Sequence, residues 1–216
     1  MDCLIVAATF AEISPFFEQY RKKVGLPANI NIDVLITGIG LTAATYSLTK
    51  QVNIKGPDII IQAGIGGCFD KSIPLGSVVA IKQDSFADQG VIESGKLKTL
   101  FDMGLMQANK YPFEKGWLIN KSEVLKKVNL KKVKGISINE ITTSTQKIAH
   151  YKETFNPVVE SMEGAALHYV CLMEKISFLQ LRSISNYIGE RNKKNWKMKD
   201  SIINLNNELI SLLHKL

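Results

Sequence analysis

The sequence has few of the residues that build metal centres or disulfide scaffolds. Only three cysteines and three histidines occur among its 216 residues. The cysteines are far apart and form no CxxC pair: Cys3, Cys68 and Cys171. The histidines show no ligand spacing with them: His150, His168 and His214. We therefore expect three reduced, mostly buried thiols, no structural zinc or other metal site, and a cytoplasmic location.

Long apolar runs and nucleotide-binding signatures are also missing. No apolar stretch reaches the roughly 18 residues that a bilayer span requires, so we expect no membrane insertion. The opening MDCLIVAATFAEI has an acidic second residue and no basic leader, which predicts a first strand and not a signal peptide. The glycine-rich segment AGIGG lacks the G-x-G-x-x-G spacing and the P-loop lysine-serine pair. We expect no bound dinucleotide, no ATP phosphate site and no other cofactor.

The net charge of +7 raises the question of a nucleic-acid partner. Much of the basic excess lies in two lysine-rich stretches, residues 126–134 and 193–199. Aromatic residues that would stack on bases are scarce in both stretches. The pattern favours a solvated basic surface over a nucleic-acid site.

Apolar strands alternate with longer amphipathic segments along the chain. Hydrophobic residues make up 45% and charged residues 22%, as in ordinary globular proteins. Strands are predicted at 3–8, 32–38, 58–64, 76–83, 133–138 and 176–185, and helices at 11–24, 41–52, 122–128, 145–155, 162–175 and 200–215. We predict one domain over residues 1–216, a three-layer α/β/α fold with a central mixed, largely parallel twisted sheet. Residues 84–117 are irregular and aromatic, and we interpret them as an insertion or hairpin near the site.

Several acidic, amide and glycine positions fall at or just past predicted strand ends: Glu12, Gly38 to Gly40, Gly64 to Gly67, Glu160 to Glu163, and Asn186. Each has an ordinary explanation, since first-turn glutamates favour the helix dipole, asparagine caps turns, and a glycine turn serves tight packing. Ligands of α/β sheets, however, bind beyond the carboxyl ends of the strands. The joint placement of these residues therefore predicts one site at that edge.

The order of five segments resembles a known superfamily. IVAATFAEI, TGIG, AGIGG, VESMEGAA and RSISN follow one another as in the purine nucleoside phosphorylases and nucleosidases. The resemblance is closest to nucleosidases acting on methylthioadenosine and S-adenosylhomocysteine, and ESMEGAALHYVC and ISNYIGERNKKNW are most similar to the futalosine hydrolases. It covers nearly the whole chain and implies cleavage of a purine nucleoside by a homodimer or larger homo-oligomer. For a futalosine hydrolase, the products are hypoxanthine and dehypoxanthine futalosine, in menaquinone biosynthesis.

The resemblance also implies roles for individual residues. Glu12 matches the glutamate that activates water, Glu163 the one that binds the ribose hydroxyls, and Met162 the methionine that packs on the sugar. Asn186 stands where adenine-specific nucleosidases carry an aspartate. The purine-stacking aromatic of those enzymes is absent from GISINEITTST. The further substrate-binding residues that we predict are Gly64, Gly66, Gly67, Ser161, Ile138 and Asn139.

The chemistry of these side chains narrows the range of substrates and nucleophiles that we expect. Asn186 hydrogen-bonds but does not give up a proton outright, which favours a 6-oxopurine, whose oxygen delocalises the departing charge. A mispaired exocyclic group in a dry site costs roughly 1–3 kcal/mol. The segment Ala8 to Glu12 holds a carboxylate and no phosphate-binding arginine, so water is the favoured nucleophile. We expect Arg182 inside its strand and Arg191 near the group distal to the ribose.

Other functions remain open from the sequence. An adenosine-type nucleosidase acting on methylthioadenosine, S-adenosylhomocysteine or aminodeoxyfutalosine has the same carboxylates. A phosphate-dependent nucleoside phosphorylase is a further alternative. A nucleotide-sensing module without catalysis would tolerate loss of Glu12 or Glu163, whereas an enzyme would not.

Overall fold

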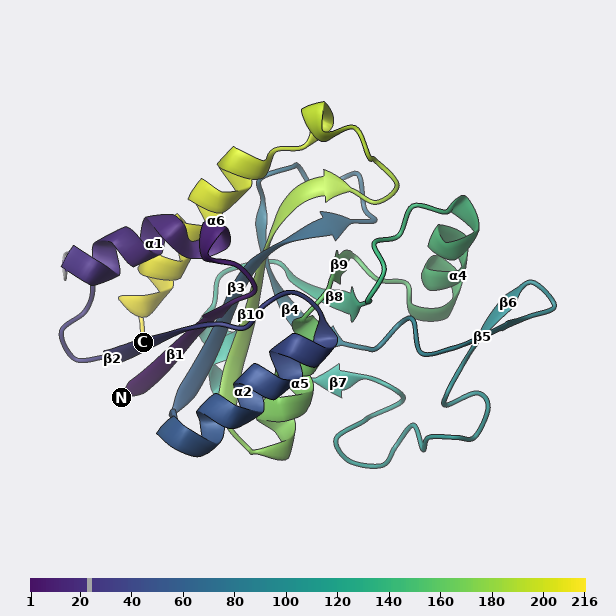
Figure 1. Cartoon of the computed structure of the whole chain (residues 1–216), viewed down its shortest axis with the longest axis horizontal. Helices are drawn as coiled ribbons and strands as arrows, with labels where there is room; N and C mark the ends of the chain where they lie inside the picture. Colours follow the sequence, from purple (N-terminus) through teal and green to yellow (C-terminus); the bar gives the residue numbers. More distant parts are fainter. Residues whose placement is uncertain (23–24) are drawn as a thin grey trace.

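The computed structural model describes residues 1–22 and 25–216. In chain order the elements are β1 (Asp2–Ala7), α1 (Phe10–Lys22), β2 (Asn31–Ile36), α2 (Leu41–Lys55), β3 (Ile59–Cys68), β4 (Val78–Asp84), β5 (Gly90–Glu93), β6 (Lys96–Thr99), β7 (Leu118–Ile119), α3 (Glu123–Lys127), β8 (Lys132–Ser137), α4 (Thr145–Phe155), β9 (Val159–Ser161), α5 (Gly164–Met173), β10 (Ser177–Tyr187), the short 3-10 helix η1 (Lys193–Asn195) and α6 (Met198–Leu213). Figure 1 shows the sheet at the centre, with the β5–β6 hairpin projecting at one end beside α4.

The central sheet is mixed and partly closed on itself. Parallel pairs join β1 to β2 and β3, β10 to β3, and β8 to β4 and β9. Antiparallel pairs join β10 to β4, β3 to β9, and β4 to β7. The pairings β3–β10–β4–β8–β9 return to β3, so these strands form a ring. The predicted mixed α/β fold with a central sheet is confirmed.

Alternation along β1 explains why helices cover both faces of the sheet. Cys3, Ile5 and Ala7 pack in one apolar cluster with residues of α1 and α6. Leu4 and Val6 point the other way, into a cluster with residues of α2 and α5. Successive strand side chains face opposite sides, so a strand that is apolar at both sets of positions is buried on both.

Most predicted elements are present, with shifted ends. The helix predicted at 145–155 coincides with α4, and the helix at 11–24 corresponds to α1, although residues 23–24 lie outside the described part of the chain. The irregular segment 84–117 contains the β5–β6 hairpin. The strand β7 and the 3-10 helix η1 were not predicted, because both are too short to show a periodic pattern.

The expected glycine turn at residues 64–67 is wrong. These residues continue β3, which runs to Cys68 and pairs with β10 along its length. A side chain would collide there with neighbours: a Cβ on Gly66 would lie 2.9 Å from Val159 Cγ1, and one on Gly67 would overlap Ile188. The glycines therefore allow close packing against the strand and do not reverse the chain.

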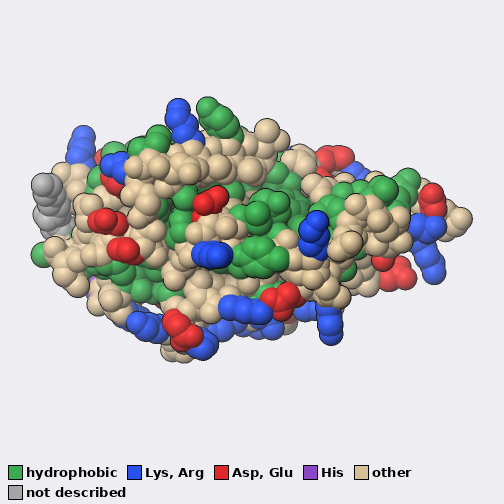
Figure 2. Space-filling view, turned by 90° about the horizontal axis from the view of Figure 1, so that it is seen from below, with side chains coloured by type: hydrophobic (Ala, Val, Ile, Leu, Met, Phe, Trp, Pro, Cys, Tyr) green, Lys and Arg blue, Asp and Glu red, His purple; other side chains and the backbone are tan. Residues whose placement is uncertain are grey.

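An apolar surface lies over α2 and the segment before β7. Tyr46 is 68% exposed and Leu105 71% exposed, and Tyr111 is also exposed. Two adjoining hollows, of about 610 and 380 Å³, share Phe113 and Tyr169 in their walls. Figure 2 shows hydrophobic side chains gathered on the side seen from below, among charged ones. We call this surface, from Tyr46 to the 105–113 segment, the α2 face.

Cys3, Cys68 and Cys171 are buried free thiols, as expected. In the part of the chain that the structure covers, every helix is too short or too polar to cross a membrane.

Candidate active site

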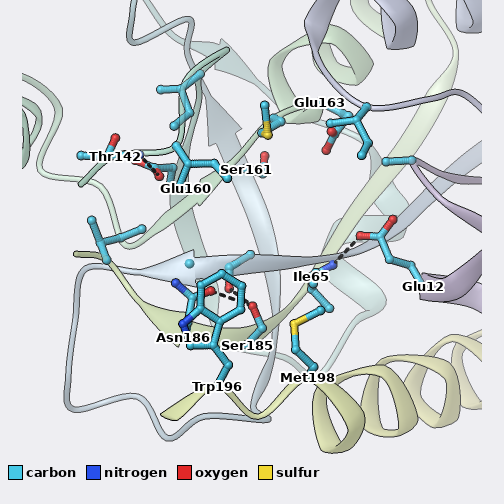
Figure 3. Close-up of a pocket in the computed structure, with 18 of the residues that line it drawn as sticks. Glu12, Ile65, Thr142, Glu160, Ser161, Glu163, Ser185, Asn186, Trp196 and Met198 are labelled. Carbon is cyan, nitrogen blue, oxygen red and sulfur yellow. Dashed lines mark hydrogen bonds between the residues drawn. The ribbon is translucent and has the colours of Figure 1, made fainter. Parts of the chain in front are cut away.

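A cavity of about 310 Å³ opens where β1, β3, β9 and β10 end. Figure 3 shows its walls, with Glu12 and Glu163 at one end and Glu160 and Asn186 toward the other. Most of the residues predicted from the sequence line it: Glu12, Gly66, Gly67, Ile138, Ser161, Met162, Glu163 and Asn186. The predicted convergence at one edge of the sheet is therefore present in the fold.

Glu12 lies in the first turn of α1, directly after β1, and is 8% exposed. Its Oε2 accepts hydrogen bonds from the backbone N–H and the hydroxyl of Thr9, at 3.0 and 3.1 Å. Its Oε1 accepts from the N–H of Ile65 in β3, at 3.0 Å. These donors fix the carboxylate at the cavity wall and join α1 to the neighbouring strand.

Glu163 precedes α5 and is 5% exposed. Its Oε1 accepts from the N–H of Gly40 at 3.1 Å, and its Oε2 lies 3.6 Å from Nη2 of Arg182. Burial raises the pKa of Glu163, and the Arg182 guanidinium and the Gly40 N–H oppose that rise. Gly40 has a φ of 93°, in the region that favours glycine, so the turn between β2 and α2 delivers this N–H.

Arg182 lies inside β10, as predicted, and is 1% exposed. Its Nη2 donates to Oε1 of Gln62 at 2.8 Å, and its Nη1 lies 3.5 Å from the carbonyl oxygen of Ile65. A Cβ on Gly64 would overlap Nη1 and would lie 3.0 Å from Oε1 of Glu12. The absence of a side chain at Gly64 therefore makes room for the guanidinium between the two site carboxylates.

Two predicted residues do not line the cavity. Gly64 lies behind it, against Arg182. Asn139 borders the hollow of the α2 face, and its Nδ2 donates to Oδ2 of Asp88 at 3.1 Å. Ile138 follows the end of β8 and lines the cavity, whereas the chain bends at Asn139, whose backbone N–H and side chain both bond to Asp88.

Asn186 is held near the end of β10 with a defined amide orientation. Its Nδ2 donates to the carbonyl oxygen of Tyr187 at 3.2 Å, and its Oδ1 accepts from Oγ of Ser185 at 2.8 Å. A carbonyl oxygen only accepts, so the amide nitrogen lies on the Tyr187 side. Its second N–H is left to donate to a ligand in the cavity.

Ser161 and Met162 connect the carboxylates of the β9–α5 junction. Oγ of Ser161 lies 3.4 Å from Oγ of Ser137 and accepts from the N–H of Gly164 at 3.3 Å, which ties the end of β9 to β8 and to the first turn of α5. Met162 is half-buried and lines the cavity between these fixed points.

The cavity also contains residues that the sequence did not single out. Trp196 follows η1 and Met198 begins α6, and Figure 3 shows Trp196 beside Asn186. The indole N–H of Trp196 donates to the carbonyl oxygen of Glu190 at 3.1 Å. Arg191, which the sequence did single out, also lines the cavity, with its guanidinium 5.8 Å from the Trp196 ring centroid. The cavity wall thus carries an aromatic side chain that comes from a part of the chain other than GISINEITTST.

The acidic groups of the site do not form a metal centre. In the described ranges, 1–22 and 25–216, no three His, Cys, Asp or Glu side chains cluster as metal ligands would. The carboxylates instead receive hydrogen bonds from backbone N–H groups and an ion pair from Arg182.

Comparison with known proteins places this geometry in a family. A family model described as the Phosphorylase superfamily matches residues 14–215. The chain belongs to the Phosphorylase superfamily. This membership confirms the resemblance seen in the sequence, and it makes the cavity at the strand ends the candidate active site of a superfamily member.

Curated relatives include two kinds of nucleosidase. The futalosine hydrolase of Thermus thermophilus is 25% identical over 199 residues, which is 90% of this chain and 85% of that protein. The 5'-methylthioadenosine/S-adenosylhomocysteine nucleosidase of Buchnera aphidicola is 25% identical over 194 residues, 86% of this chain and 80% of that protein.

Solved structures show the same fold. The futalosine hydrolase of Helicobacter pylori superposes with a TM-score of 0.82 at 19% identity, covering 100% of this chain and 98% of that one. The 5'-methylthioadenosine/S-adenosylhomocysteine nucleosidase of the same species, with butyl-thio-DADMe-Immucillin-A, gives 0.81 at 18% identity, covering 100% and 99%. The overall architecture is therefore that of these proteins.

Proposed function

We propose that the protein hydrolyses the N-glycosidic bond of futalosine and releases hypoxanthine and dehypoxanthine futalosine, in the futalosine route to menaquinone. The observation that carries the proposal is the pair of oriented carboxylates, Glu12 and Glu163, in one cavity with the amide of Asn186. A carboxylate pair with a polar group for the leaving base is what glycosidic hydrolysis requires.

The two carboxylates divide the work at the sugar. Breaking the bond builds positive charge on the ribosyl carbon, and Glu163 stabilises that charge while accepting hydrogen bonds from the ribose hydroxyls. Glu12 accepts a proton from the attacking water, a step worth on the order of 10²–10⁴-fold. The N–H of Ile65 and the side chain of Thr9 hold Glu12 in place for that role. Met162 packs on the sugar.

Asn186 hydrogen-bonds to the departing base. Its free amide N–H donates to N7 on the 6-oxo side of the purine, where negative charge develops. Hypoxanthine places that charge on its oxygen and therefore leaves without a strong acid beside it. The amide is thus better suited to a 6-oxopurine than to adenine.

The charges of the cavity support water as the nucleophile. Among the described residues that line it, the acidic ones are Glu12, Glu160, Glu163 and Glu190, whereas the one basic residue is Arg191. Arg182 is buried and engaged with Glu163 and Gln62. A phosphate ion in the cavity would meet these four carboxylates and the single guanidinium of Arg191, a balance that favours water over phosphate.

A second candidate is a nucleosidase that acts on methylthioadenosine, S-adenosylhomocysteine or aminodeoxyfutalosine. It is supported by the nucleosidase of Buchnera aphidicola, which matches this chain at the same 25% identity as the futalosine hydrolase. Glu12 and Glu163 would have the same roles with either kind of substrate. The purine base that is released therefore distinguishes the two candidate functions.

The active form that we propose is a homodimer or larger homo-oligomer joined through the α2 face. Ile39 is 61% exposed and also lines the cavity, so a partner that covers this face would reach the rim of the site. The exposed Tyr46, Leu105 and Tyr111 supply apolar area that association would remove from water.

Purine release in phosphate-free buffer tests the proposal. Futalosine, its 6-amino analogue, methylthioadenosine and inosine are offered separately, and the freed base is separated by chromatography. We expect fast hypoxanthine release from futalosine without added phosphate. Faster adenine release would establish the second candidate, and turnover only with phosphate would establish a phosphorylase.

Variants of the two carboxylates test the mechanism in the same assay. Glu12→Gln and Glu163→Gln should each lower kcat by about 10²-fold or more. Glu18→Gln is the control, because Glu18 lies on the same helix as Glu12 and pairs with Arg21 on the exposed surface. Full turnover by the Glu12 and Glu163 variants would point to a binding module.

A further inference from the structure

Asn206 is a buried amide in the middle of α6, and the roles at the sugar and the base leave it unused. It is 1% exposed and lies where α6 packs on α1, near the apolar side chains of Phe16 and Leu205. Figure 1 shows the two helices side by side on one face of the sheet. Asparagine is a poor helix former, and a buried amide is costly unless it is hydrogen-bonded. The hydrogen-bond partners of Asn206 therefore indicate its role.

The partners of Asn206 are backbone groups of α1 and of its own helix. Its Oδ1 accepts from the N–H of Phe16 at 3.0 Å, and its Nδ2 donates to the carbonyl oxygen of Glu12 at 2.8 Å. Nδ2 also donates to the carbonyl oxygen of Ile202 at 2.6 Å. Both N–H groups and the oxygen of the amide are thus engaged, which fixes the orientation of the side chain.

The two groups of α1 that Asn206 binds are those that a regular helix would pair with each other. In an α-helix the N–H of Phe16 donates to the carbonyl oxygen of Glu12, four residues earlier. The preceding hydrogen bond of the helix cannot form, because Pro15 has no N–H to donate to the carbonyl oxygen of Ala11. Asn206 therefore supports the turn of α1 that carries Glu12, where proline has removed a helix hydrogen bond.

The same amide connects Glu12 with the cavity wall that α6 supplies. Met198 and Ile202, in the first two turns of α6, line the cavity together with Glu12. Figure 3 shows Met198 on the part of the wall between Trp196 and Glu12. Because Nδ2 of Asn206 bonds to the carbonyl oxygens of both Ile202 and Glu12, a shift of α6 would be passed to the backbone of Glu12.

We propose that Asn206 is a positioning residue for the hydrolytic step: it holds the backbone of Glu12 and thereby sets the distance between the Glu12 carboxylate and the attacking water. This inference rests on the proposed function, since it takes Glu12 as the group that accepts the proton from water. Thr9 and Ile65 hold the carboxylate, and Asn206 holds the other end of the same residue. A misplacement of about 1 Å costs on the order of 10²-fold in rate, so the hold at both ends affects turnover.

Steady-state hydrolysis by Asn206→Ala tests the inference, with the nucleoside that the wild type cleaves fastest in phosphate-free buffer. Without the amide, the N–H of Phe16 and the carbonyl oxygen of Glu12 pair with each other, so the fold is kept and the turn tightens. We expect kcat to fall by about 10–100-fold, because Glu12 moves. KM should change by less than about 3-fold, because the amide binds backbone groups and its loss leaves the side chains of the cavity wall in place.

Asn204→Ala is the matched control for this variant. Asn204 lies on the same helix, and its Nδ2 donates to the carbonyl oxygen of Gly76 at 2.9 Å. The control therefore loses an asparagine and a hydrogen bond to a distant backbone group, but no bond to α1. It should keep the wild-type kcat.

A double variant separates positioning from a merely structural role. Asn206→Ala in the Glu12→Gln background should lower kcat by less than about a further 3-fold, because the carboxylate through which Asn206 acts is already gone. Leu212→Ala is the structural comparison, because Leu212 is 3% exposed and packs in the apolar cluster between α6 and the sheet. It should lower the resistance to urea and keep kcat.

Asn206→Val keeps the inference testable if the alanine variant does not fold. Its side chain has a similar size to asparagine and no polar atom, so it fills the space but holds neither Phe16 nor Glu12. We expect the same loss in kcat. The inference is overturned if the folded variants of Asn206 keep the wild-type kcat, if the losses of Asn206→Ala and Glu12→Gln multiply in the double variant, or if Leu212→Ala loses kcat as strongly.

The hydrolysis assay distinguishes this failure from that of the proposed function. Hypoxanthine release by the wild type with an unchanged kcat in Asn206→Ala overturns the inference alone. Absence of purine release from every nucleoside in phosphate-free buffer overturns the proposed function and the inference with it, because Glu12 then activates no water.

Discussion

At the scale of single residues, the site depends on the missing side chain of Gly64. The position lies in the middle of β3, between the Arg182 guanidinium and the Glu12 carboxylate. Arg182 in turn reaches Glu163 and Gln62. One methyl group added at Gly64 would therefore disturb both carboxylates without touching the cavity itself.

We predict that Gly64→Ala lowers kcat by about 10–100-fold and destabilises the fold by roughly 1–3 kcal/mol, the usual cost of overpacking. Steady-state kinetics and urea unfolding measure the two effects. Gly135→Ala is the control, because a Cβ there would also be tight, 3.0 Å from Ile81 Cγ2 and from Oδ2 of Asp84, while its close contacts include neither Arg182 nor Glu12. It should lose stability and keep kcat. Equal kcat losses in both variants would contradict the special role of Gly64.

The sequence predicted the residues of the site that sit in recognisable local patterns. Glu12 and Asn186 each follow or end an apolar run, and both line the cavity. Asn139 does not line the cavity, because the chain bends after β8 and Asp88 binds the Asn139 side chain at the hollow of the α2 face. Trp196 could not be found, because its segment is charged and reaches the site only through the fold.

At the scale of elements, α5 carries a buried histidine against β7. His168 is fully buried, and its Nδ1 lies 2.8 Å from the carbonyl oxygen of Leu118, so Nδ1 holds the hydrogen. Burial lowers the pKa of His168 to about 4. The folded state thus binds a second imidazole proton less tightly than the unfolded state, whose histidine keeps a pKa near the ordinary value of 6.5.

The contribution of the neutral His168 to the free energy of unfolding is present above pH 6.5 and is lost as the pH falls toward 4. We predict that His168→Asn, which keeps a donor for Leu118, removes up to roughly 3 kcal/mol of the stability loss between pH 7 and pH 4. Urea unfolding at both pH values measures this. An unchanged pH dependence would show that the imidazole is not kept neutral by burial.

Asp84, which ends β4, gives the opposite trend. Burial raises the pKa of Asp84 to about 6. The protonated carboxyl therefore contributes to the free energy of unfolding at low pH, and this contribution is lost as the pH rises through 6. Asp84→Asn serves as the contrasting variant for the histidine experiment, and its gain in stability relative to wild type should be larger at pH 8 than at pH 4.

A helix or strand could be predicted from the sequence where nearby residues determine its bounds. The helix at 145–155 was predicted to the residue, since Ser144 caps it and Asn156 ends it in a left-handed conformation. The second half of β3 was not, because glycines ordinarily mark turns. Here they are required by the approach of β10 and β9, which is information held in distant parts of the chain.

At the scale of the whole molecule, the α2 face is an exposed apolar surface that no described element of the fold covers. Tyr46 is 68% exposed and lines one hollow of this face together with Leu41 and Phe113. We predict that Tyr46→Glu shifts the protein toward monomer in analytical ultracentrifugation, because association would bury the added charge. The weakening should be at least about 10-fold in the dissociation constant.

Ile203→Glu is the control for that experiment. Ile203 is 42% exposed and lies on α6, which packs on the other face of the sheet. It should leave the oligomeric state unchanged. A wild-type protein that sediments as a monomer, or equal behaviour of the two variants, would reject the α2 face as the contact between copies.

The ring of strands has a consequence for protein synthesis. β10 pairs with both β3 and β4, and it also carries Asn186. A ribosome that has made the chain only as far as α5 has produced Glu12 and Glu163 but neither the closing strand nor the wall that holds the base. The proposed function therefore predicts that translation products ending before β10 do not consume nucleosides, so that turnover in a lysate would count finished molecules.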